Sequence, residues 1–305
     1  MPPSPSLNRR PHDRWIGLAL LAVTAFGWGL NWPAIKILLA DWPPLFSRGV
    51  SGVAAAIILA LIARGRGESL AVPRGFGARL SFAAFTNVFA WMGFGTMAMK
   101  YLSVSEGSLL VYTMPIWATL FAWPVLGQRP AWRDGVGLLL GICGIAVLFG
   151  GQSLALGPDR LIGVGLALAA ATLFALGGVL TRTALPMPPT VLVAWQVGLG
   201  CLPMIGLGLM FERPDIGALS AGGAAVLLYM TLVPMGLCYL SWFAALGRLP
   251  TTTASIAILV VPIIGVVAAA LALGEPLGWR QVAALVLTLA GVALALQRPK
   301  PASTV

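Results

Sequence analysis

The chain has 305 residues, of which 59% are hydrophobic and only 9% are charged, and its mean hydropathy is +0.93. A water-soluble domain carries about 25% charged residues, so this composition excludes an ordinary soluble protein. The formal net charge is +10, which basic loops facing anionic lipid explain without a nucleic-acid partner. We therefore expect a membrane protein that contacts membrane lipid and binds no nucleic acid.

Long apolar runs alternate with short polar or helix-breaking segments from residue 15 onward. A membrane span needs roughly 20 apolar residues, and backbone groups in hydrocarbon must be satisfied within their own helix. The pattern predicts an all-α polytopic membrane protein with ten transmembrane helices. In chain order the predicted spans are 15–36, 44–63, 80–99, 104–125, 134–150, 161–184, 190–210, 219–242, 252–273 and 279–297.

Two parts of the chain resemble each other at a shared offset of 147 residues. LGQRPAWR at 126–133 recurs as LGEPLGWR at 273–280, and the same offset aligns Pro115 with Pro262. Each half holds five predicted spans, an odd number, so the second half must enter the membrane from the opposite side. The predicted units are a disordered cytoplasmic tail (1–14), two inverted five-helix repeats (15–150 and 161–297) and a cytoplasmic tail (298–305).

Lys and Arg residues are distributed unequally between the two sides of the predicted spans. With the N-terminus in the cytoplasm, 13 of the 19 basic residues fall on the cytoplasmic side, in agreement with the excess of Lys and Arg in cytoplasmic loops. We expect a multi-pass protein whose N- and C-termini are both cytoplasmic. Lys36 and Arg48 fall near the predicted outer boundary, where they either extend to lipid headgroups or attract a substrate carboxylate.

Residue types that enzymes and metal sites require are scarce. The one histidine, His12, lies in the N-terminal tail, and Cys143, Cys201 and Cys238 fall inside predicted spans without metal-ligand spacing. The motifs GxSxG, GxGxxG and GxxxxGK[ST] do not occur in the sequence. We therefore expect no enzyme, no metal, no cofactor and no drive by ATP hydrolysis.

Two predicted spans carry polar and aromatic residues on one helical face. Thr24, Trp28 and Asn31 follow i, i+4 and i+7 spacing on the first span, and Asn87 and Trp91 follow i, i+4 spacing on the third. A polar face at mid-membrane must meet protein or water, so both faces are candidate walls of a substrate cavity. Packing against a neighbouring helix explains the same residues equally well.

The fourth span carries Ser108, Tyr112 and Pro115 on one face, and its repeat mate carries Ser255 and Pro262 with Leu at the Tyr position. The loss of Tyr on the matched face is compatible with an asymmetric ligand in a symmetric scaffold, and also with drift after duplication. Each proline removes one helical hydrogen bond, so we expect a kink near mid-membrane. The kink is either a hinge of a transport cycle or a static bend.

The seventh span adds Gln196 to the candidate cavity residues, because hydrocarbon rejects its amide more strongly than the neighbouring Trp195. Tyr239 and Trp242, near the cytoplasmic end of the eighth span, are expected instead in an interfacial aromatic belt. The predicted cavity residues are Thr24, Trp28, Asn31, Asn87, Trp91, Ser108, Tyr112, Gln196 and Ser255.

FGWGLNWPAIK at 26–36, the Pro115 and Pro262 spans followed by LG-x-x-x-x-WR, and the five-plus-five arrangement resemble the drug/metabolite transporter superfamily. Over nearly its whole length the chain is similar to the ten-helix EamA branch, and within it to amino-acid and metabolite exporters of the YddG type. The resemblance implies two pseudo-symmetric halves around a central cavity. It also implies export of small metabolites across a bacterial inner membrane by alternating access.

All nine acidic residues fall in tails, loops or predicted span ends, so no mid-membrane carboxylate is available to couple transport to protons. We expect a facilitator, or a carrier coupled by another route, that acts as a monomer or homodimer. Neutral or zwitterionic substrates with an apolar body fit the Trp and Tyr residues, and aromatic or other hydrophobic amino acids are the predicted substrates.

Three other functions remain compatible with the sequence. A lipid-carrier flippase would have an apolar groove that opens sideways to lipid. A nucleotide-sugar or sugar-phosphate carrier would place several Lys or Arg at mid-membrane to neutralise phosphate. A non-transporting membrane scaffold would need no continuous polar path.

Overall fold

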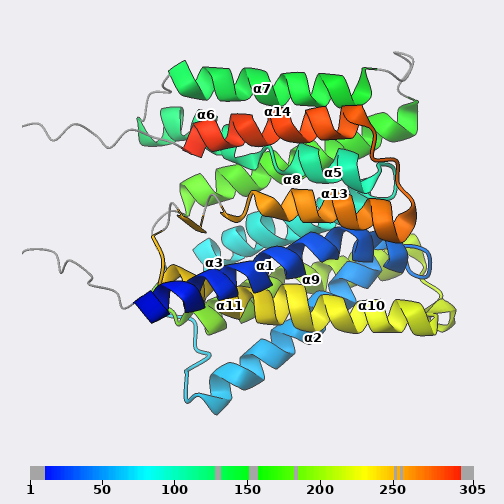
Figure 1. The fold of residues 1–305 in the computed structure, drawn as a ribbon. Coiled ribbons are helices and arrows are strands. Elements are labelled where there is room, and N and C mark those ends of the chain that lie inside the picture. The colour runs from blue at the N-terminus through cyan, green and yellow to red at the C-terminus, as the bar shows by residue number, and fades with distance from the viewer. Residues whose placement is uncertain are drawn as a thin grey trace, which may run out of the picture.

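The computed structural model folds the chain into a bundle of helices (Figure 1). It describes residues 11–127, 132–150, 157–181, 185–250, 253–254 and 257–296. Every regular element in these ranges is helical, which confirms the predicted all-α fold. The start of α1 and the end of α14 lie at the same end of the bundle (Figure 1), which we call the terminal end; the opposite end is the far end.

The first half of the chain contains the predicted spans one to five. Its segments are α1 (Pro11–Leu38), α2 (Pro44–Gly65), α3 (Gly77–Ala84), η1 (Phe85–Phe94), α4 (Gly95–Ala98), α5 (Val104–Val111), α6 (Met114–Leu126) and α7 (Trp132–Phe149). The third span is a run of α3, η1 and α4, in which η1 is a π-helix. The fourth span is divided between α5 and α6.

The second half follows the same order. Its segments are α8 (Pro158–Leu180), α9 (Pro189–Leu207), η2 (Gly208–Glu212), η3 (Ile216–Ala218), α10 (Ala221–Leu232), η4 (Val233–Leu237), α11 (Cys238–Leu246), α13 (Val260–Leu273) and α14 (Trp279–Leu296). The eighth span is a run of α10, η4 and α11, and η4 is again a π-helix.

Seven helices in the described ranges are long and apolar enough to cross a membrane. They are Asp13–Leu38, Pro44–Gly65, Val104–Leu126, Trp132–Phe149, Pro158–Leu180, Pro189–Glu212 and Ala221–Leu246. The shorter apolar helices Val260–Leu273 and Trp279–Leu294 fall in the last two predicted spans. Together with the run from α3 to α4, these helices make the chain a polytopic membrane protein.

The first helix begins earlier than the sequence predicts. α1 starts at Pro11, so residues 11–14 of the predicted tail are helical. Residues 1–10 and 298–305 lie outside the described ranges.

Helices that are equivalent under the repeat pack in equivalent ways. α2 packs along its mate α9, and α7 packs along its mate α14. α1 packs on α13 and α11, whereas its mate α8 packs on α6 and η1. The 147-residue offset maps α13 onto α6, and it maps α11 onto the end of η1 and α4, which also packs on α8. The tertiary contacts therefore have the symmetry that an inverted repeat requires.

The repeated Leu-Gly pair marks the same helix end in both halves. Gly127 ends α6 and Gly274 ends α13, each with a φ of 67°. This left-handed conformation suits glycine, which lacks a Cβ atom, and is common just after a helix.

Neither Pro115 nor Pro262 removes a hydrogen bond from the interior of a helix. The expectation that each proline costs its span one helical hydrogen bond is therefore wrong. A two-residue turn separates α5 from α6, and two turn residues precede α13. Pro115 is the second residue of α6, and Pro262 is the third residue of α13. The N–H groups of a first helical turn have no intrahelical acceptor, so proline is tolerated there. The bend of the fourth span therefore comes from the turn that precedes Pro115.

Glycine lets α9 approach the third span closely. A Cβ atom added at Gly200 would lie 2.6 Å from Cβ of Val88 and 2.9 Å from the carbonyl oxygen of Ala84. Gly206, on the same helix, has no such neighbour within 4 Å. The two positions therefore have the same helical backbone but opposite steric environments.

Gly200→Ala should destabilise the protein by about 1–3 kcal/mol, the usual penalty of overpacking. Gly206→Ala should leave stability unchanged or raise it slightly, because alanine favours the helix by about 1 kcal/mol. Thermal unfolding of the two purified variants and the parent protein in one detergent measures the difference. Equal melting temperatures for both variants would contradict the packing described here.

Candidate functional site: a central aromatic cavity

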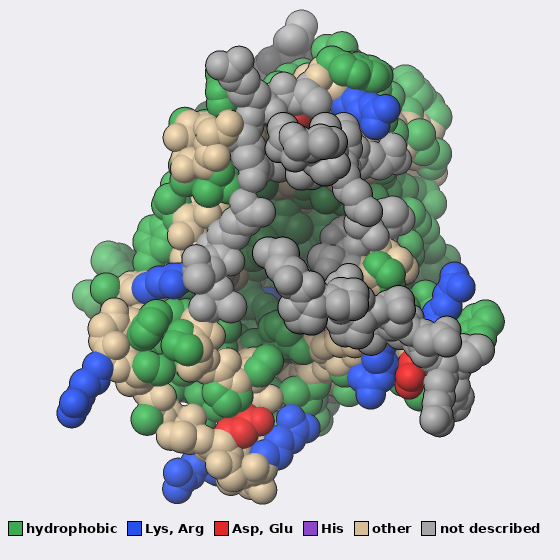
Figure 2. All heavy atoms as spheres, turned by 90° about the vertical axis from the view of Figure 1, so that its left-hand side faces the viewer, with side chains coloured by type: hydrophobic (Ala, Val, Ile, Leu, Met, Phe, Trp, Pro, Cys, Tyr) green, Lys and Arg blue, Asp and Glu red, His purple; other side chains and the backbone are tan. Residues whose placement is uncertain are grey.

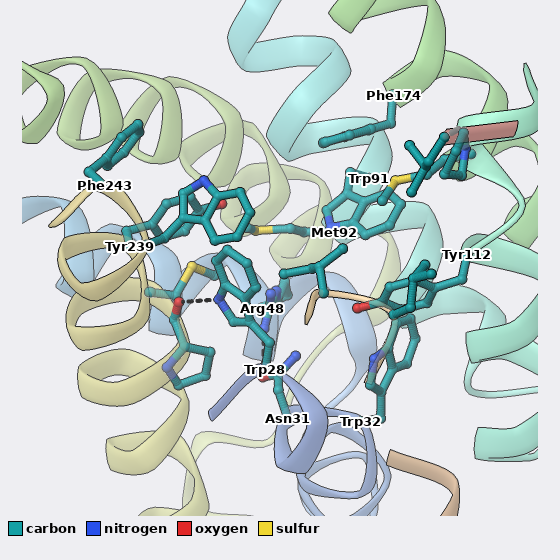
Figure 3. Close-up of a pocket in the computed structure, with 18 residues that line it drawn as sticks. Trp28, Asn31, Trp32, Arg48, Trp91, Met92, Tyr112, Phe174, Tyr239 and Phe243 are labelled. Carbon is teal, nitrogen blue, oxygen red and sulfur yellow. Dashed lines mark hydrogen bonds between the residues drawn. The ribbon is translucent and has the colours of Figure 1, made fainter. Parts of the chain in front are cut away.

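A cavity of about 420 Å³ lies at the centre of the bundle. Small-molecule sites usually enclose about 300–1,000 Å³ and combine an apolar wall with a few polar groups. The wall here is mainly aromatic and aliphatic. It consists of Trp28, Asn31, Trp32, Arg48, Trp91, Met92, Tyr112, Met114, Pro115, Phe174, Pro234, Met235, Tyr239, Trp242, Phe243, Ile258, Leu259 and Leu296 (Figure 3).

The cavity is directed toward the terminal end of the bundle. Asn31 belongs to the second half of α1, whereas Leu296 is the last residue of α14, at the terminal end. The molecular surface of that end is hollowed, and hydrophobic side chains are visible within the hollow (Figure 2).

Carboxylates from the second half hold the far end together. Glu275 accepts hydrogen bonds from the backbone N–H of Val104 at 2.8 and 3.0 Å. Glu212 accepts from the N–H groups of Leu45 and Phe46 at 3.0 and 2.9 Å. Each carboxylate satisfies free N–H groups at the start of a first-half helix. It also lies at the positive end of that helix's dipole.

Further polar contacts lie at the same end. Glu106 forms a capping box with Ser103 at the start of α5, and its other oxygen pairs with Arg160 of α8 at 2.7 Å. Asp41 accepts hydrogen bonds from the backbone N–H and the hydroxyl of Ser220 at 2.9 and 2.6 Å. The two halves are thus bonded to each other at the far end, opposite the direction in which the cavity extends.

The first aromatic cluster consists of Trp28, Tyr239 and Trp242. The ring centroids of Tyr239 and Trp242 lie 5.5 and 5.8 Å from that of Trp28. The Trp28 indole Nε1 donates a hydrogen bond to the Pro234 carbonyl oxygen at 2.9 Å (Figure 3). This bond fixes the indole ring of α1 against η4 and satisfies its only polar atom.

The second aromatic cluster consists of Trp32, Tyr112, Trp91 and Phe174. Trp91 lies 4.6 Å from Phe174 and 6.4 Å from Tyr112 between ring centroids, and Tyr112 lies 6.1 Å from Trp32. The cluster joins α1, η1, the α5–α6 turn and α8. Flat apolar surfaces from four segments therefore form one side of the cavity.

The two π-helical segments supply cavity residues from both halves. η1 carries Trp91 and Met92, and η4 carries Pro234 and Met235. The segments begin 148 residues apart, at Phe85 and Val233, so they are equivalent within about one residue. π-helical turns change the direction of side chains relative to an α-helix and are frequent at functional sites.

Arg48 is a buried cation in the cavity wall, with 4% of its surface exposed. Its Nη1 donates a hydrogen bond to Oδ1 of Asn31 at 3.4 Å, whereas Nε has no partner. No ion pair to Arg48 is formed by any Asp or Glu of the described ranges. The interpretation that Arg48 extends to lipid headgroups is therefore wrong, because one turn inside α2 its side chain faces the bundle interior.

The structure brings together five residues that the sequence singled out. Trp28, Asn31, Trp91, Tyr112 and Pro115 all line the cavity. They come from α1, η1, the α5–α6 turn and the start of α6, so the marked faces of the first, third and fourth spans meet in one space.

Thr24 and Ser108 are buried in helix contacts and do not line this cavity. The Thr24 hydroxyl donates to the carbonyl oxygens of Leu20 and Cys238 at 2.9 and 3.4 Å. The Ser108 hydroxyl donates to the Ser105 carbonyl oxygen at 3.5 Å. A hydroxyl group within a helix can bond the preceding turn, so its polarity does not require a cavity.

Asn87 and Gln196 bind each other instead of lining this cavity. Nδ2 of Asn87 donates to Oε1 of Gln196 at 3.2 Å between η1 and α9. Amide pairs of this kind join helices in membranes without a ligand. Pro262 is buried in α13 and is absent from the cavity wall, and Ser255 lies outside the described residues.

Several wall residues were not predicted, among them Trp32, Phe174, Tyr239 and Trp242, and Arg48 was singled out only through the alternative that it attracts a substrate carboxylate. The assignment of Tyr239 and Trp242 to an interfacial belt is wrong, because both side chains lie in the cavity wall. The internal repeat could have identified Tyr239 as a cavity residue, because it follows the predicted cavity residue Trp91 by 148 positions. The same spacing relates η4 to η1.

Comparison with known proteins identifies the family. Residues 15–150 and 161–297 each match the model of the EamA-like transporter family. The chain belongs to the EamA-like transporter family. The double match confirms the resemblance noted from the sequence and the duplication of the fold.

Curated relatives of this EamA-like transporter span most of its length. It is 31% identical over 289 residues to a protein of Salmonella typhimurium (strain LT2) named a probable amino-acid metabolite efflux pump, with 90% of this chain and 92% of the relative covered. It is 28% identical over 286 residues to the transporter YvbV of Bacillus subtilis (strain 168), with 92% of each covered. A solved crystal structure covers 94% of this chain and 97% of its own, with a TM-score of 0.66 at 18% identity, and shares the fold.

The Asn87–Gln196 pair predicts an energetic coupling between two helices. Asn87→Ala and Gln196→Ala should each lower stability, and the double variant should lose less than their sum by about 0.6 kcal/mol, typical of such bonds in membranes. Unfolding of the three variants and the parent protein gives this coupling energy. Strictly additive losses would show that the two amides do not interact.

Proposed function

We propose that this transporter exports small amphipathic metabolites, above all aromatic or other hydrophobic amino acids, across a bacterial inner membrane. The observation that carries the proposal is a cavity in which two aromatic clusters flank the polar pair of Arg48 and Asn31. Aromatic surfaces suit the apolar body of such a solute, and the polar pair suits its charged end. The name of the Salmonella relative, a probable amino-acid metabolite efflux pump, agrees with this substrate class.

Alternating access is the mechanism that we propose for this cavity. With both termini in the cytoplasm, a cavity directed to the terminal end and a bonded far end correspond to an inward-facing state. The outward-facing state would require release of contacts such as Glu275 to Val104. The turns before Pro115 and Pro262 are the proposed hinges, because a break in a helix lets its two parts reorient without loss of interior hydrogen bonds.

The alternatives make different demands on the cavity. A phosphate-bearing substrate carries two negative charges and would call for several basic groups, whereas the described wall supplies only Arg48. A lipid-carrier flippase would prefer lipid-linked substrates to free amino acids. A scaffold would show no transport of any solute.

Uptake into proteoliposomes tests the substrate class. Trp91→Ala should raise the half-saturation concentration for a radiolabelled aromatic amino acid by about tenfold, equivalent to about 1.4 kcal/mol of lost binding, because it removes a surface of the second aromatic cluster. Trp123, which is 54% exposed on α6, gives the matched control, and Trp123→Ala should leave uptake unchanged. Absence of uptake of every amino acid by folded protein would overturn the proposal.

Coupling to protons is tested in the same vesicles. No carboxylate lines the described wall, so uptake should proceed only to equal concentrations and should ignore an imposed pH gradient. Concentration of the amino acid above equilibrium in response to the gradient would contradict facilitated transport and would require a proton-binding group elsewhere.

A further inference from the structure

Arg48 is the one charged side chain in the described wall of the cavity. No Asp or Glu lines this wall, and all nine acidic residues of the chain belong to the described ranges. Among them, Glu212 and Glu275 bind helix N-termini and Glu106 pairs with Arg160. No protein carboxylate is therefore placed to neutralise the cavity.

The guanidinium of Arg48 has unused donors. Arginine presents five N–H groups in a planar fork and stays protonated in proteins. Here Nη1 has one long bond of 3.4 Å to Asn31, and Nε has none. A buried charge without a partner destabilises its surroundings, so an anion that enters the cavity gains by completing the site.

The side-chain amide of Asn31 adds a second hydrogen-bond donor next to the Arg48 guanidinium. Its Oδ1 accepts from Arg48, which leaves Nδ2 without an acceptor among the described residues. Figure 3 shows Arg48 and Asn31 between Tyr239 on one side and Tyr112 and Trp32 on the other. A planar anion that bonds to both Arg48 and Asn31 would extend its apolar body along these rings.

We propose that a carboxylate is the group that this cavity requires of its ligand, and that an amino group is not required. The inference rests on the proposed function, since the same cavity must be the substrate site. The carboxylate binds the Arg48 fork and Nδ2 of Asn31 in charge-assisted hydrogen bonds. No Asp or Glu of the described wall is available to pair with an ammonium group, which meets aromatic faces and neutral oxygens such as the Tyr112 and Tyr239 hydroxyls. The ligand class is monocarboxylates with an apolar or aromatic body, including acids without an amino group, and excludes their amides and amines.

Matched acids and amides test this selectivity by binding alone. The probes are L-phenylalanine, 3-phenylpropionate and indole-3-propionate, each beside its amide, with phenethylamine as the body without a carboxylate. Their effects on the melting temperature and tryptophan fluorescence of the purified protein are measured, so membrane permeation plays no part. The acids should bind, with or without an amino group, and the amides and the amine should bind roughly 100-fold more weakly, as expected when buried donors lose their acceptor.

Variants assign the selectivity to Arg48. Arg48→Gln should abolish the preference for acids while melting no lower than the parent protein without ligand, because it removes an unpaired buried charge. Arg48→Lys should retain weaker binding of acids, since it keeps the charge but loses the fork. The exposed Arg74 provides a control with the same change of net charge, and Arg74→Gln should bind like the parent protein.

Four results would overturn the inference: amides that bind as tightly as acids, phenylalanine that binds while phenylpropionate does not, acid selectivity that survives in Arg48→Gln, or no binding of any acid. Uptake of amino acids into proteoliposomes distinguishes a failure of the carboxylate inference from a failure of the proposed function. Binding of the propionates without transport of any amino acid would refute amino-acid export and leave the carboxylate requirement standing. Transport of amino acids without binding of the propionates would refute the carboxylate inference alone.

Discussion

Hydrocarbon offers no hydrogen bonds to the backbone, and this constraint governs where the helices of the transporter can begin and break. Helix starts at the far end are satisfied by carboxylates from the opposite half: Glu212 binds the start of α2, and Glu275 binds the start of α5. The same bonds join the two halves. Closure of the far end and satisfaction of helix termini are therefore one interaction, so a movement that opens this end must provide other partners for the freed N–H groups.

The irregular parts of the spans create the cavity. The π-helical segments η1 and η4 and the turns before α6 and α13 occupy matching positions in the two halves, and each contributes residues to the wall. The duplicated backbone thus provides a nearly symmetric space. The side chains then make it asymmetric, because Arg48 is the single cation of the described wall and lies between two unlike aromatic clusters. Shape and charge together suit a solute with an apolar body and one anionic end, which links the fold to the proposed substrate class.

Local patterns in the sequence determined the class of protein, the order of its spans and the duplication. Hydropathy and span length are properties of consecutive residues, so they do not depend on the tertiary structure. Helical spacing also identified Trp28, Asn31, Trp91 and Tyr112, since residues of a shared stripe lie on one face whatever that face contacts. Spacing could not tell whether a polar face meets a cavity or another helix. Thr24 bonds its own helix and α11, and Asn87 bonds Gln196, so equally polar positions have different roles.

Only the tertiary structure decided which way the residues near the predicted boundaries point. Arg48 and Tyr239 lie near the ends of their predicted spans, where lipid headgroups and an aromatic belt are the usual environment. The packing of α2 along α9 turns Arg48 to the interior, and the π-helical turn η4 precedes Tyr239, which also lines the cavity. Helix rotation depends on contacts between segments more than a hundred residues apart, which no local pattern encodes. The sequence by itself therefore determined that this is a duplicated membrane transporter, and the packing of its helices decided that the described wall of its cavity holds one positive charge without an acidic partner.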